Sequence, residues 1–289
     1  MIRRIGFVLI CLFPWMVGCQ PSDSNEQLFE KGLKLGTNKN SQLEEASGLA
    51  ASVSNPGCLW SHNDSGSPPE IFLLDSLAKT KKVFHLANLV NRDWEDIALG
   101  PCPGSSTSCI YIGDIGDNLA RYPYKYIYRL KEPSLTDDEE IKIFDTLVVK
   151  LPDGIRDSEA LMVDPVSSNI YLVTKREHAV IVYEIANPAH SDTVIAKIVC
   201  KIPHQHIVSA DISPDGNEVL IKSYEHIYYW KKKGKESIVE VLQTPATKLL
   251  YDPEPQGEAI AWARNGSGYY TLSENGKGER GKLYFYKRK

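Results

Sequence analysis

Short apolar runs separated by polar segments dominate the chain from residue 28 onward. The runs are four to eight residues long and rich in Tyr, Ile, Val and Leu, and Gly, Pro, Asn and Asp lie between them. This pattern is typical of β-strands joined by turns. No segment of convincing length in this region has the 3.6-residue period of an amphipathic helix. The pattern therefore predicts an all-β fold.

A short motif, acidic or small at its start and apolar at its end, recurs along the chain. The clearest copies are Asp93–Ala98, Asp157–Met162 and Gln256–Ala261, and weaker copies are Ala46–Ala50 and Ser209–Ser213. Aligning positions 47, 95, 159, 210 and 258 gives spacings of 48, 64, 51 and 48 residues. Repeats of roughly 40–50 residues with several short strands each are typical of β-propeller blades. The sequence therefore predicts a five-bladed β-propeller, as a single domain over residues 28–289.

Further apolar runs complete each repeat. The first four units, each expected to have four strands, are residues Glu45–Ala87, Trp94–Leu151, Glu159–Ile202 and Ala210–Leu242. In the fourth unit, we expect the outermost strand at Ile238–Leu242. The fifth unit, Glu258–Tyr286, ends without a fourth strand. We expect Leu28–Leu35 to supply it, because an open ring would leave unpaired strand edges.

The blade order predicts that polar residues gather at one end of the propeller. The loop entering the first strand of a blade lies on the same face as the loop between its second and third strands. The repeated motif lies at the start of the first strand. Polar clusters follow the second strand at Ser61–Gly66, Gly113–Asn118, Thr174–Glu177 and Ser273–Gly276. The two series should meet at one mouth of the central channel.

This predicted mouth carries the candidate site. Its ligand-binding candidates are His62, Asn63, Asp64, Arg92, Asp93, Arg156, Asp157, Lys175, Arg176, Asp211 and Glu274. The basic residues among them are the expected counter-charges. Carboxylates crowded in a partly closed channel raise each other's pKa unless something compensates. A hard cation is one such compensation, and calcium takes six to eight oxygen ligands.

We therefore predict calcium in or near the channel. The candidate metal ligands are Glu95, Asp96, Asp114, Asp117 and Glu159. The alternative is that backbone amides and the nearby arginines satisfy these carboxylates. For Asp114 and Asp117, a tight turn in which the side chains bond their own backbone remains a second interpretation. The run Tyr224, Tyr228, Tyr229 and Trp230 fits strand packing, and Lys231–Lys233 fits a solvated turn.

The N-terminus has the features of an export signal. Arg3 and Arg4 precede an apolar stretch, Ile5–Val17, that is too short to span a bilayer comfortably. Met16–Cys19 resembles a bacterial lipobox, which implies a lipid on Cys19; the alternative is an ordinary secretory signal with a chance cysteine. Residues 1–18 would then be a lipoprotein signal peptide and 19–27 a lipidated tether. Because Gln20 follows the cysteine, we expect anchoring at the outer membrane of the cell envelope, facing the periplasm or the exterior.

The cysteines and the net charge lead to further expectations about disulfides and partners. An exported chain can form disulfides, and Cys102 and Cys109 flank a turn-rich hairpin tip, so we expect them to be bonded. The sequence leaves the state of Cys58 and Cys200 open, because only their geometry decides whether they are free or bonded. The net charge is −4 and becomes −6 without Arg3 and Arg4, which argues against nucleic acid as a partner. We expect a monomer.

The repeated motifs resemble known propeller families. Glu45–Ala50 and Asp93–Ala98, with their repeats, resemble the strand starts of the SdiA-regulated and phytase-like propellers. The resemblance implies a calcium-associated extracytoplasmic propeller. The chain departs from these families where they carry Glu-Gly, as at Glu95-Asp96, and it does not match the multi-calcium, multi-lysine phosphate site of the phytases.

Three functions remain open. The first is a lipid-anchored propeller whose mouth binds a small-molecule or protein ligand. The second is a metal-assisted hydrolase of phosphate or related esters, with Lys175, Arg176 or Arg156 neutralising charge and a glutamate activating water. The third is a glycosidase with Glu95, Glu159 and Glu258 as candidate catalytic acids and bases, which requires two carboxyls at about 5–5.5 or 6.5–9.5 Å. Carboxylates within about 5 Å of one point would favour a metal instead.

Overall fold

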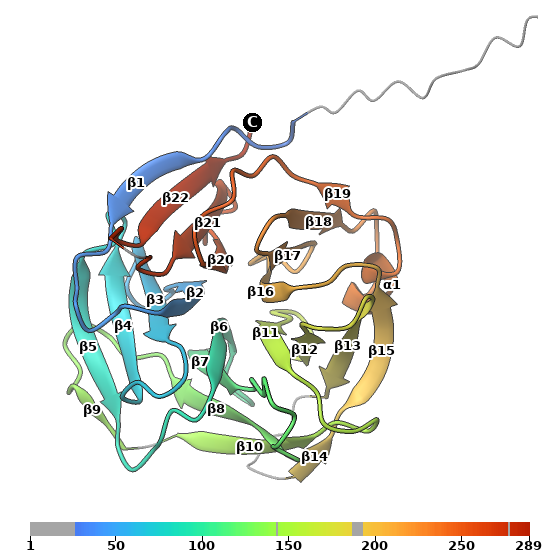
Figure 1. Ribbon diagram of the computed structural model, residues 1–289, viewed down its shortest axis with the longest axis horizontal. Coiled ribbons are helices and arrows are strands. Elements are labelled where there is room, and N and C mark those ends of the chain that lie inside the picture. The colour runs from blue at the N-terminus through green and yellow to red at the C-terminus, as the bar shows by residue number, and fades with distance from the viewer. Residues whose placement is uncertain (1–26, 143, 187–192, 277) are drawn as a thin grey trace, which may run out of the picture.

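The computed structural model of the chain describes residues 27–142, 144–186, 193–276 and 278–289. Within these residues, the strands form five small sheets arranged as blades in a ring (Figure 1). The predicted all-β, five-bladed propeller is therefore confirmed. The predicted signal peptide, with Cys19, falls outside the described residues. No helix in the described part of the chain is long and apolar enough to cross a membrane.

The first two blades each have four antiparallel strands. Blade 1 contains β2 (Ala46–Ala51), β3 (Cys58–Asn63), β4 (Glu70–Asp75) and β5 (Thr80–Leu86). Blade 2 contains β6 (Trp94–Pro101), β7 (Ser108–Asp114), β8 (Lys125–Lys131) and β10 (Asp145–Lys150). Two short strands, β9 (Glu140–Ile141) and β14 (Thr193–Ile195), pair in parallel with β5 and β10 respectively. The long connection between β8 and β10 thus extends the sheet of the preceding blade.

The remaining three blades complete the ring. Blade 3 contains β11 (Ser158–Val163), β12 (Ile170–Thr174), β13 (Val180–Ile185) and β15 (Lys197–Ile202). Blade 4 contains β16 (Ile207–Ile212), β17 (Glu218–Ser223), β18 (Ile227–Lys231) and β19 (Thr247–Lys248). Blade 5 contains β20 (Gly257–Trp262), β21 (Gly268–Ser273), β22 (Lys282–Lys287) and the N-terminal strand β1 (Leu33–Thr37).

The N-terminal segment closes the ring as predicted, although the strand lies slightly later than expected. β1 pairs antiparallel with β22, with Leu33 opposite Phe285, and Phe29 forms a separate bridge with Arg288. Phe29 is 4% exposed and its ring lies 5.0 Å from that of Tyr269. A protein beginning at Pro21 would therefore keep every described strand and this packing.

One predicted strand is wrong. Residues Ile238–Leu242 form a short α-helix, α1, and the outermost strand of blade 4 is β19. Ser237 and Glu240 form a capping box, in which the Ser237 hydroxyl accepts from the Glu240 amide and the Glu240 carboxylate accepts from the Ser237 amide. This arrangement satisfies amides that have no partner within a helix. The Ser-x-x-Glu spacing was therefore the signal for a helix here.

The apolar core lies between neighbouring blades. Between blades 1 and 2, for example, Trp60 and Phe84 pack in one buried cluster with Trp94 and Ile97. Each such large side chain contributes about 1.5–3 kcal/mol when it is fully buried. Packing between blades therefore stabilises the ring and fixes how far the inner strands lie from the axis.

A buried carboxylate joins three inner strands. Asp96 of β6 is fully buried and accepts hydrogen bonds from the amides of Ile97 (3.0 Å), Leu161 (3.0 Å) and Ala210 (3.2 Å) and from the Ser209 hydroxyl (3.1 Å). Leu161 belongs to blade 3, and Ser209 and Ala210 belong to blade 4. Burial raises the pKa of Asp96, and these hydrogen bonds oppose the rise. Asp96 is thus a structural link across the axis.

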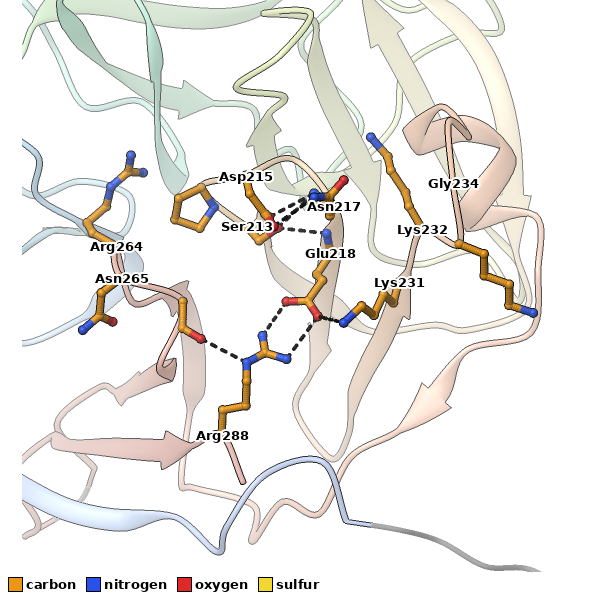
Figure 2. A pocket seen from close by; sticks show the side chains of 13 residues that line it. Ser213, Asp215, Asn217, Glu218, Lys231, Lys232, Gly234, Arg264, Asn265 and Arg288 are labelled. Carbon is orange, nitrogen blue, oxygen red and sulfur yellow. Dashed lines mark hydrogen bonds and ion pairs between the residues drawn. The ribbon is translucent and has the colours of Figure 1, made fainter.

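The end of the ring where the inner strands begin is the channel mouth, and the opposite end is the hairpin face. On the hairpin face, a pocket of about 680 Å³ lies between the β16–β17 hairpin (Ser213–Asn217), Lys231–Gly234 and the β20–β21 hairpin (Arg264–Gly266). Arg288, which follows β22, also lines it (Figure 2).

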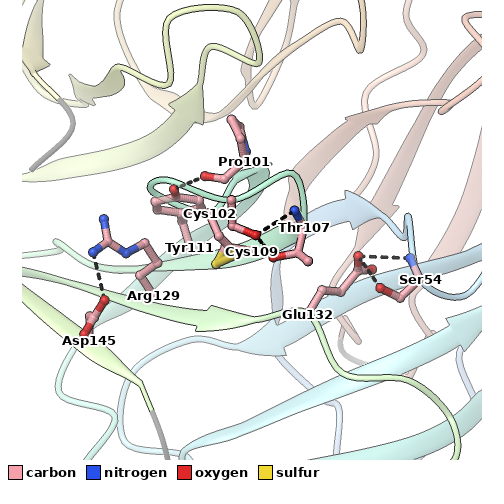
Figure 3. The surroundings of a disulfide bond; sticks show 10 residues. Ser54, Pro101, Cys102, Thr107, Cys109, Tyr111, Arg129, Glu132 and Asp145 are labelled. Atoms are coloured by element: carbon pink, nitrogen blue, oxygen red, sulfur yellow. Dashed lines mark hydrogen bonds and ion pairs between the residues drawn. A yellow bond between two sulfur atoms is a disulfide. The ribbon is translucent and has the colours of Figure 1, made fainter. Parts of the chain in front are cut away.

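The predicted disulfide is confirmed. Cys102 and Cys109 are bonded across the hairpin between β6 and β7, with an S–S distance of 2.01 Å (Figure 3). Near it, the Tyr111 hydroxyl donates to the carbonyl of Pro101 at 2.7 Å. Cys58 and Cys200, whose state the sequence left open, are free.

We predict that Asp96→Ala lowers the free energy of unfolding by about 3 kcal/mol or more, because it leaves buried donors in three blades without an acceptor. Urea unfolding of the protein from Pro21 measures this. The control is Asp138→Ala, which removes an exposed carboxylate and should change the value by less than about 0.5 kcal/mol. Equal effects of the two substitutions would contradict the structural role of Asp96.

Candidate metal centre at the channel mouth

All five inner strands share one irregularity near their start. The pairing register shifts between Ala46 and Gly48, Trp94 and Asp96, Ser158 and Ala160, Ile207 and Ser209, and Gly257 and Ala259. The skipped residues are Ser47, Glu95, Glu159, Val208 and Glu258. A bulge of this kind re-aims a side chain out of the regular pleat. Glu95, Glu159 and Glu258 therefore occupy the same structural position in three blades.

The fourth repeat was aligned wrongly from the sequence. The residue equivalent to the three glutamates is Val208, two positions before the Ala210 that the alignment chose. The error arises because the blade 4 motif has no carboxylate at this position to mark it. The same misalignment explains why Asp211, which was predicted at the mouth, lies near the opposite end of β16. There it lines a small cavity with Pro214 and Arg264. Its carboxylate accepts from the Trp262 amide at 2.8 Å.

Backbone hydrogen bonds bring the two polar series together. In four blades, the backbone amide of the first residue after the second strand donates to a backbone carbonyl at the entry to the inner strand. This carbonyl belongs to the residue two positions before the skipped one. These pairs are Asp64 to Glu45 (2.9 Å), Ile115 to Asp93 (3.1 Å), Lys175 to Asp157 (3.1 Å) and Glu274 to Gln256 (3.0 Å). The repeated bond holds the residue that follows each second strand beside the entry to the inner strand.

Three carboxylates converge on one side of the mouth. Asp64, Asp93 and Glu95 each have an oxygen within 4.8 Å of the others. Asp93 and Glu95 are buried, and Asp64 is half-buried. Burial, followed by the carboxylates of Glu258 and Asp93, raises the pKa of Asp64 to about 6. Burial also raises the pKa of Asp93.

Glu159 extends this group toward blade 3. Burial, followed by the nearby Glu159 carboxylate, raises the pKa of Glu95 well above its usual range. Burial likewise raises the pKa of Glu159 to about 7, although the Lys175 ammonium, 2.8 Å from Glu159 Oε2, opposes the rise. Glu159 is 2% exposed, and its Oε1 has no hydrogen-bond donor other than the neighbouring Glu95 carboxyl when that group is protonated. A buried carboxylate oxygen without a partner is costly, and a cation at the mouth would satisfy it.

A chain of contacts continues around the mouth to blade 5. Lys175 lies 5.3 Å from the centre of the Tyr224 ring, and the Tyr224 hydroxyl donates to Glu258 Oε1 at 2.5 Å. Glu258 lies against Glu274, and burial together with the Glu258 carboxylate raises the pKa of Glu274 to about 9. Asp64 is close enough to Glu274 to contribute to this rise. The acidic groups therefore encircle the mouth.

Most of the predicted counter-charges are engaged elsewhere. Arg92 pairs with Asp114, Arg156 with Asp153 and Glu177, and Arg176 with Asp157. His62 is fully buried, and burial lowers its pKa to about 4, so it is neutral near pH 7. Among the basic residues predicted at the mouth, Lys175 is the one that the described structure pairs with a skipped glutamate. The mouth therefore keeps an excess of negative charge.

Several predicted ligands are already satisfied by the protein. Asp114 accepts from Arg92 Nε at 2.9 Å and from the Tyr128 hydroxyl at 3.2 Å. Asp117 accepts from the amides of Arg121 and Tyr122, both at 2.7 Å, and pairs with Lys125 at 3.5 Å. Asp157 accepts from the Asp117 amide at 2.8 Å. Asn63 accepts from the Glu45 amide at 3.0 Å. These contacts fit the alternative in which backbone and arginines satisfy the acidic loops.

Two residues at the mouth were not predicted. Tyr224 was assigned to strand packing, although it follows β17 as Asp64 follows β3 and Lys175 follows β12. Gly116 leaves room for the carboxylates, because a Cβ there would lie 2.0 Å from Glu95 Oε1 and 2.7 Å from Asp93 Oδ2. The repeat position was the signal for Tyr224. For Gly116, the sequence showed only a turn.

Comparisons with known proteins do not identify a family. The chain matches none of the known protein families with which it was compared, and it has no significant match among curated proteins. The chemistry of the site therefore carries the functional argument.

The raised carboxyl pKa values predict how stability depends on pH in EDTA. The folded protein binds protons that the unfolded chain has already released, so the free energy of unfolding should fall from pH 5 to pH 9. Asp64, Glu159 and Glu274 contribute to this loss of stability until they ionise in the folded protein, at about pH 6, 7 and 9 respectively. One extra bound proton corresponds to about 1.4 kcal/mol per pH unit. Urea unfolding at these pH values tests this, and Glu159→Gln should flatten the slope. A stability that rises over this range would contradict it.

Proposed function

We propose that the protein is a membrane-anchored extracytoplasmic propeller that holds a calcium ion at its channel mouth and binds a small-molecule or protein ligand there. The observation that carries the calcium site is the convergence of Asp64, Asp93 and Glu95 within 4.8 Å beside the buried Oε1 of Glu159. The lipid anchor rests on the lipobox-like segment ending at Cys19, and the envelope location rests on it as well.

The donor set suits calcium. The converging atoms are all carboxylate oxygens, which hard cations prefer, and no thiol or imidazole lies among them. These residues come from the β3–β4 loop, the segment entering β6, and β6 itself, with Glu159 added from β11. An ion bound there would link the inner strands of blades 2 and 3 with the loop of blade 1. It would also offset the repulsion that raises the carboxyl pKa values.

The mouth is built to present such an ion to a ligand. Asp64 and Glu274 are half-buried, so the acidic ring is accessible from its outer side. The Lys175 ammonium, 2.8 Å from Glu159 Oε2, supplies hydrogen-bond donors at the mouth, and the Tyr224 hydroxyl, which donates to Glu258, can accept from a ligand. A ligand carrying a carboxylate or phosphate oxygen would match this combination of a cation and donors.

We predict that EDTA lowers the thermal unfolding midpoint of the protein from Pro21 and that added calcium restores it. Calcium at 100 times its dissociation constant would contribute about 2.7 kcal/mol. Asp93→Asn should abolish the calcium-dependent shift. The matched control is Asp164→Asn, because Asp164 is 6% exposed and Asp93 is 8% exposed, but Asp164 accepts from Ser167 in the β11–β12 turn.

Two results would contradict the calcium site. One is a midpoint that does not respond to EDTA or calcium in the unsubstituted protein. The other is a calcium-dependent shift that survives in Asp93→Asn at the size seen for Asp164→Asn.

A specific observation favours metal-assisted ester hydrolysis as the second candidate function. Burial raises the pKa of Glu159 to about 7, which suits a general base at neutral pH, and Lys175 and Tyr224 lie beside it. A calcium ion held by Asp64, Asp93 and Glu95 would supply Lewis-acid polarisation of an ester oxygen; in this mechanism Lys175 offsets developing negative charge and Glu159 accepts a proton from water.

We predict for this second function that p-nitrophenyl phosphate or a related ester is hydrolysed in the presence of calcium. Lys175→Met should lower kcat/KM by about 100-fold, because it removes a donor to the developing charge. Lys150→Met is the control, since Lys150 is exposed on β10 of blade 2. If the calcium-loaded, unsubstituted protein does not hydrolyse the ester, the second function is contradicted and ligand binding remains the proposed function of the mouth.

A further inference from the structure

The pocket on the hairpin face is bordered by five basic residues from separate parts of the chain. They are Lys231, Lys232, Lys233, Arg264 and Arg288, and the carboxylates that also line the pocket are Asp215 and Glu218. The sequence places the lysines in one turn, but only the fold adds the two arginines. A net positive surface here contrasts with the chain as a whole, whose net charge is −4.

Part of this charge is neutralised at the floor of the pocket. Both terminal nitrogens of Arg288 donate to Glu218, Lys231 lies 3.3 Å from the same carboxylate, and the Tyr229 hydroxyl donates to it at 2.6 Å (Figure 2). Arg288 also stacks on the ring of Phe29, with its guanidinium carbon 4.9 Å from the ring centre. These contacts make Arg288 a structural residue.

The charge that remains lies at the rim. Among the residues that the structure describes, Lys232, Lys233 and Arg264 form no salt bridge. Figure 2 shows Arg264 on one side of the Glu218–Arg288 pair and Lys232 on the other. Three cations without a salt bridge thus border a solvent-accessible hollow, and one of them, Arg264, lies near the Asp211 carboxylate. Such an arrangement favours anionic groups spread over a surface.

An exposed apolar side chain accompanies these cations. Val166 is 75% exposed and lies at the turn between β11 and β12, on the same face. It contacts the β16–β17 hairpin, because a Cβ on Gly216 would lie 2.7 Å from Val166 Cγ2. We call Lys232, Lys233, Arg264 and Val166 the basic hairpin surface. Basic residues with an apolar side chain among them are typical of surfaces that bind the headgroup region of a bilayer.

The N-terminal segment enters the fold on this face. The Leu28 carbonyl accepts from the Lys289 amide at 3.1 Å, and Phe29 pairs with Arg288, which lines the pocket. Gln27 lies eight residue steps after Cys19, and a fully extended chain of that length reaches at most about 28 Å. A lipid on Cys19 would therefore keep the hairpin face within reach of the bilayer surface.

The acidic mouth does not oppose this orientation. The mouth lies at the other ends of the inner strands, and charges separated by more than the Debye length of about 8–10 Å are largely screened in physiological salt. The carboxylates that line the pocket are Asp215, which accepts from Ser213 and Asn217, and Glu218. Two more lie close to the basic residues: Asp211 near Arg264, and Glu236, which accepts from the Lys233 amide at 2.6 Å.

We propose that the basic hairpin surface docks onto anionic phospholipid headgroups of the membrane that carries the anchor, so that the acidic mouth faces away from that membrane. This proposal adds to the lipid anchor of the proposed function, but the docking surface can be tested without the lipid. Each basic side chain at an anionic bilayer contributes roughly fivefold to the partition coefficient.

The test is sedimentation of the protein from Pro21 with vesicles of phosphatidylcholine, with and without phosphatidylglycerol. We expect binding only to the vesicles with phosphatidylglycerol, and weaker binding at high salt. The triple variant Lys232→Glu, Lys233→Glu, Arg264→Glu should bind at least tenfold more weakly. The control, Lys150→Glu, Lys197→Glu, Lys201→Glu, makes the same charge change at exposed positions on the outer strands of blades 2 and 3 and should bind within about twofold of the unsubstituted protein.

Three outcomes would overturn the proposal. The first is no binding to vesicles with phosphatidylglycerol, and the second is equal loss in the two triple variants, which would mean that binding follows net charge alone. The third is displacement of the protein from the vesicles by millimolar glycerol 3-phosphate at constant ionic strength, which would make the pocket a site for a soluble phosphate. Thermal unfolding of each variant confirms that it is folded.

Failure of the anchor gives a different result. Cys19→Ser in the full chain should release the protein from the membrane fraction if Cys19 carries the lipid. A chain that is not lipidated could still bind phosphatidylglycerol vesicles, and a lipidated chain could fail to do so. The two experiments therefore separate the docking surface from the anchor.

Discussion

Repulsion among partly buried carboxylates is the constraint on which the channel mouth depends. Three inner strands present a glutamate at the same skipped position, and the loops after the second strands add Asp64 and Glu274. Lys175 is paired with Glu159, and the Lys125 and Lys222 ammonium groups lie near Asp93 and Glu258 respectively. Like charges in a site with little water cannot all remain ionised without compensation. Protons or a cation must therefore bind there, and the proposed calcium ion would meet this requirement.

The same type of group is satisfied in a different way deeper in the ring. Asp96 follows Glu95 directly, yet its carboxylate accepts four hydrogen bonds from blades 2, 3 and 4. Glu159, by contrast, has one oxygen with no donor other than the Glu95 carboxyl when that group is protonated. Asp96 therefore holds the inner strands together, and Glu95 and Glu159 remain available to an ion. Two adjacent residues of one motif thus have different roles: Asp96 is structural, and Glu95 is a candidate ligand of the proposed ion.

Much of the fold could be predicted from the sequence, because repeats, alternating apolar runs and the need to close the ring all act locally or recur. The repeated motif located four of the five skipped positions directly, at Ser47, Glu95, Glu159 and Glu258. Blade 4 was harder, since Val208 gives no polar signal and the Ser-x-x-Glu helix start was hidden in an apolar run. The partners of Arg92, Arg156 and Arg176 could not be predicted, because they depend on which loops the fold brings together. The role of Tyr224 became visible only once its position in the repeat was known.

The two ends of the propeller differ in charge, with acidic groups at the mouth and basic groups on the hairpin face, and this difference follows from the strand order. Inner strands begin at the acidic mouth and end in the hairpins that carry Arg264 and Val166. The closing strand β1 starts on the hairpin face, so the N-terminal segment and the basic residues lie together. The proposed calcium site at one end and the proposed membrane-docking surface at the other are therefore compatible within the same fold.

The most direct test of the central claim is to locate the ion itself. Anomalous diffraction from crystals of the protein grown with calcium, collected at a wavelength where calcium scatters anomalously, would show where it binds. The account predicts one strong peak among Asp64, Asp93, Glu95 and Glu159, with oxygen atoms at about 2.3–2.6 Å from it. A mouth without such a peak at saturating calcium, with its carboxylates held by hydrogen bonds to one another, would contradict it.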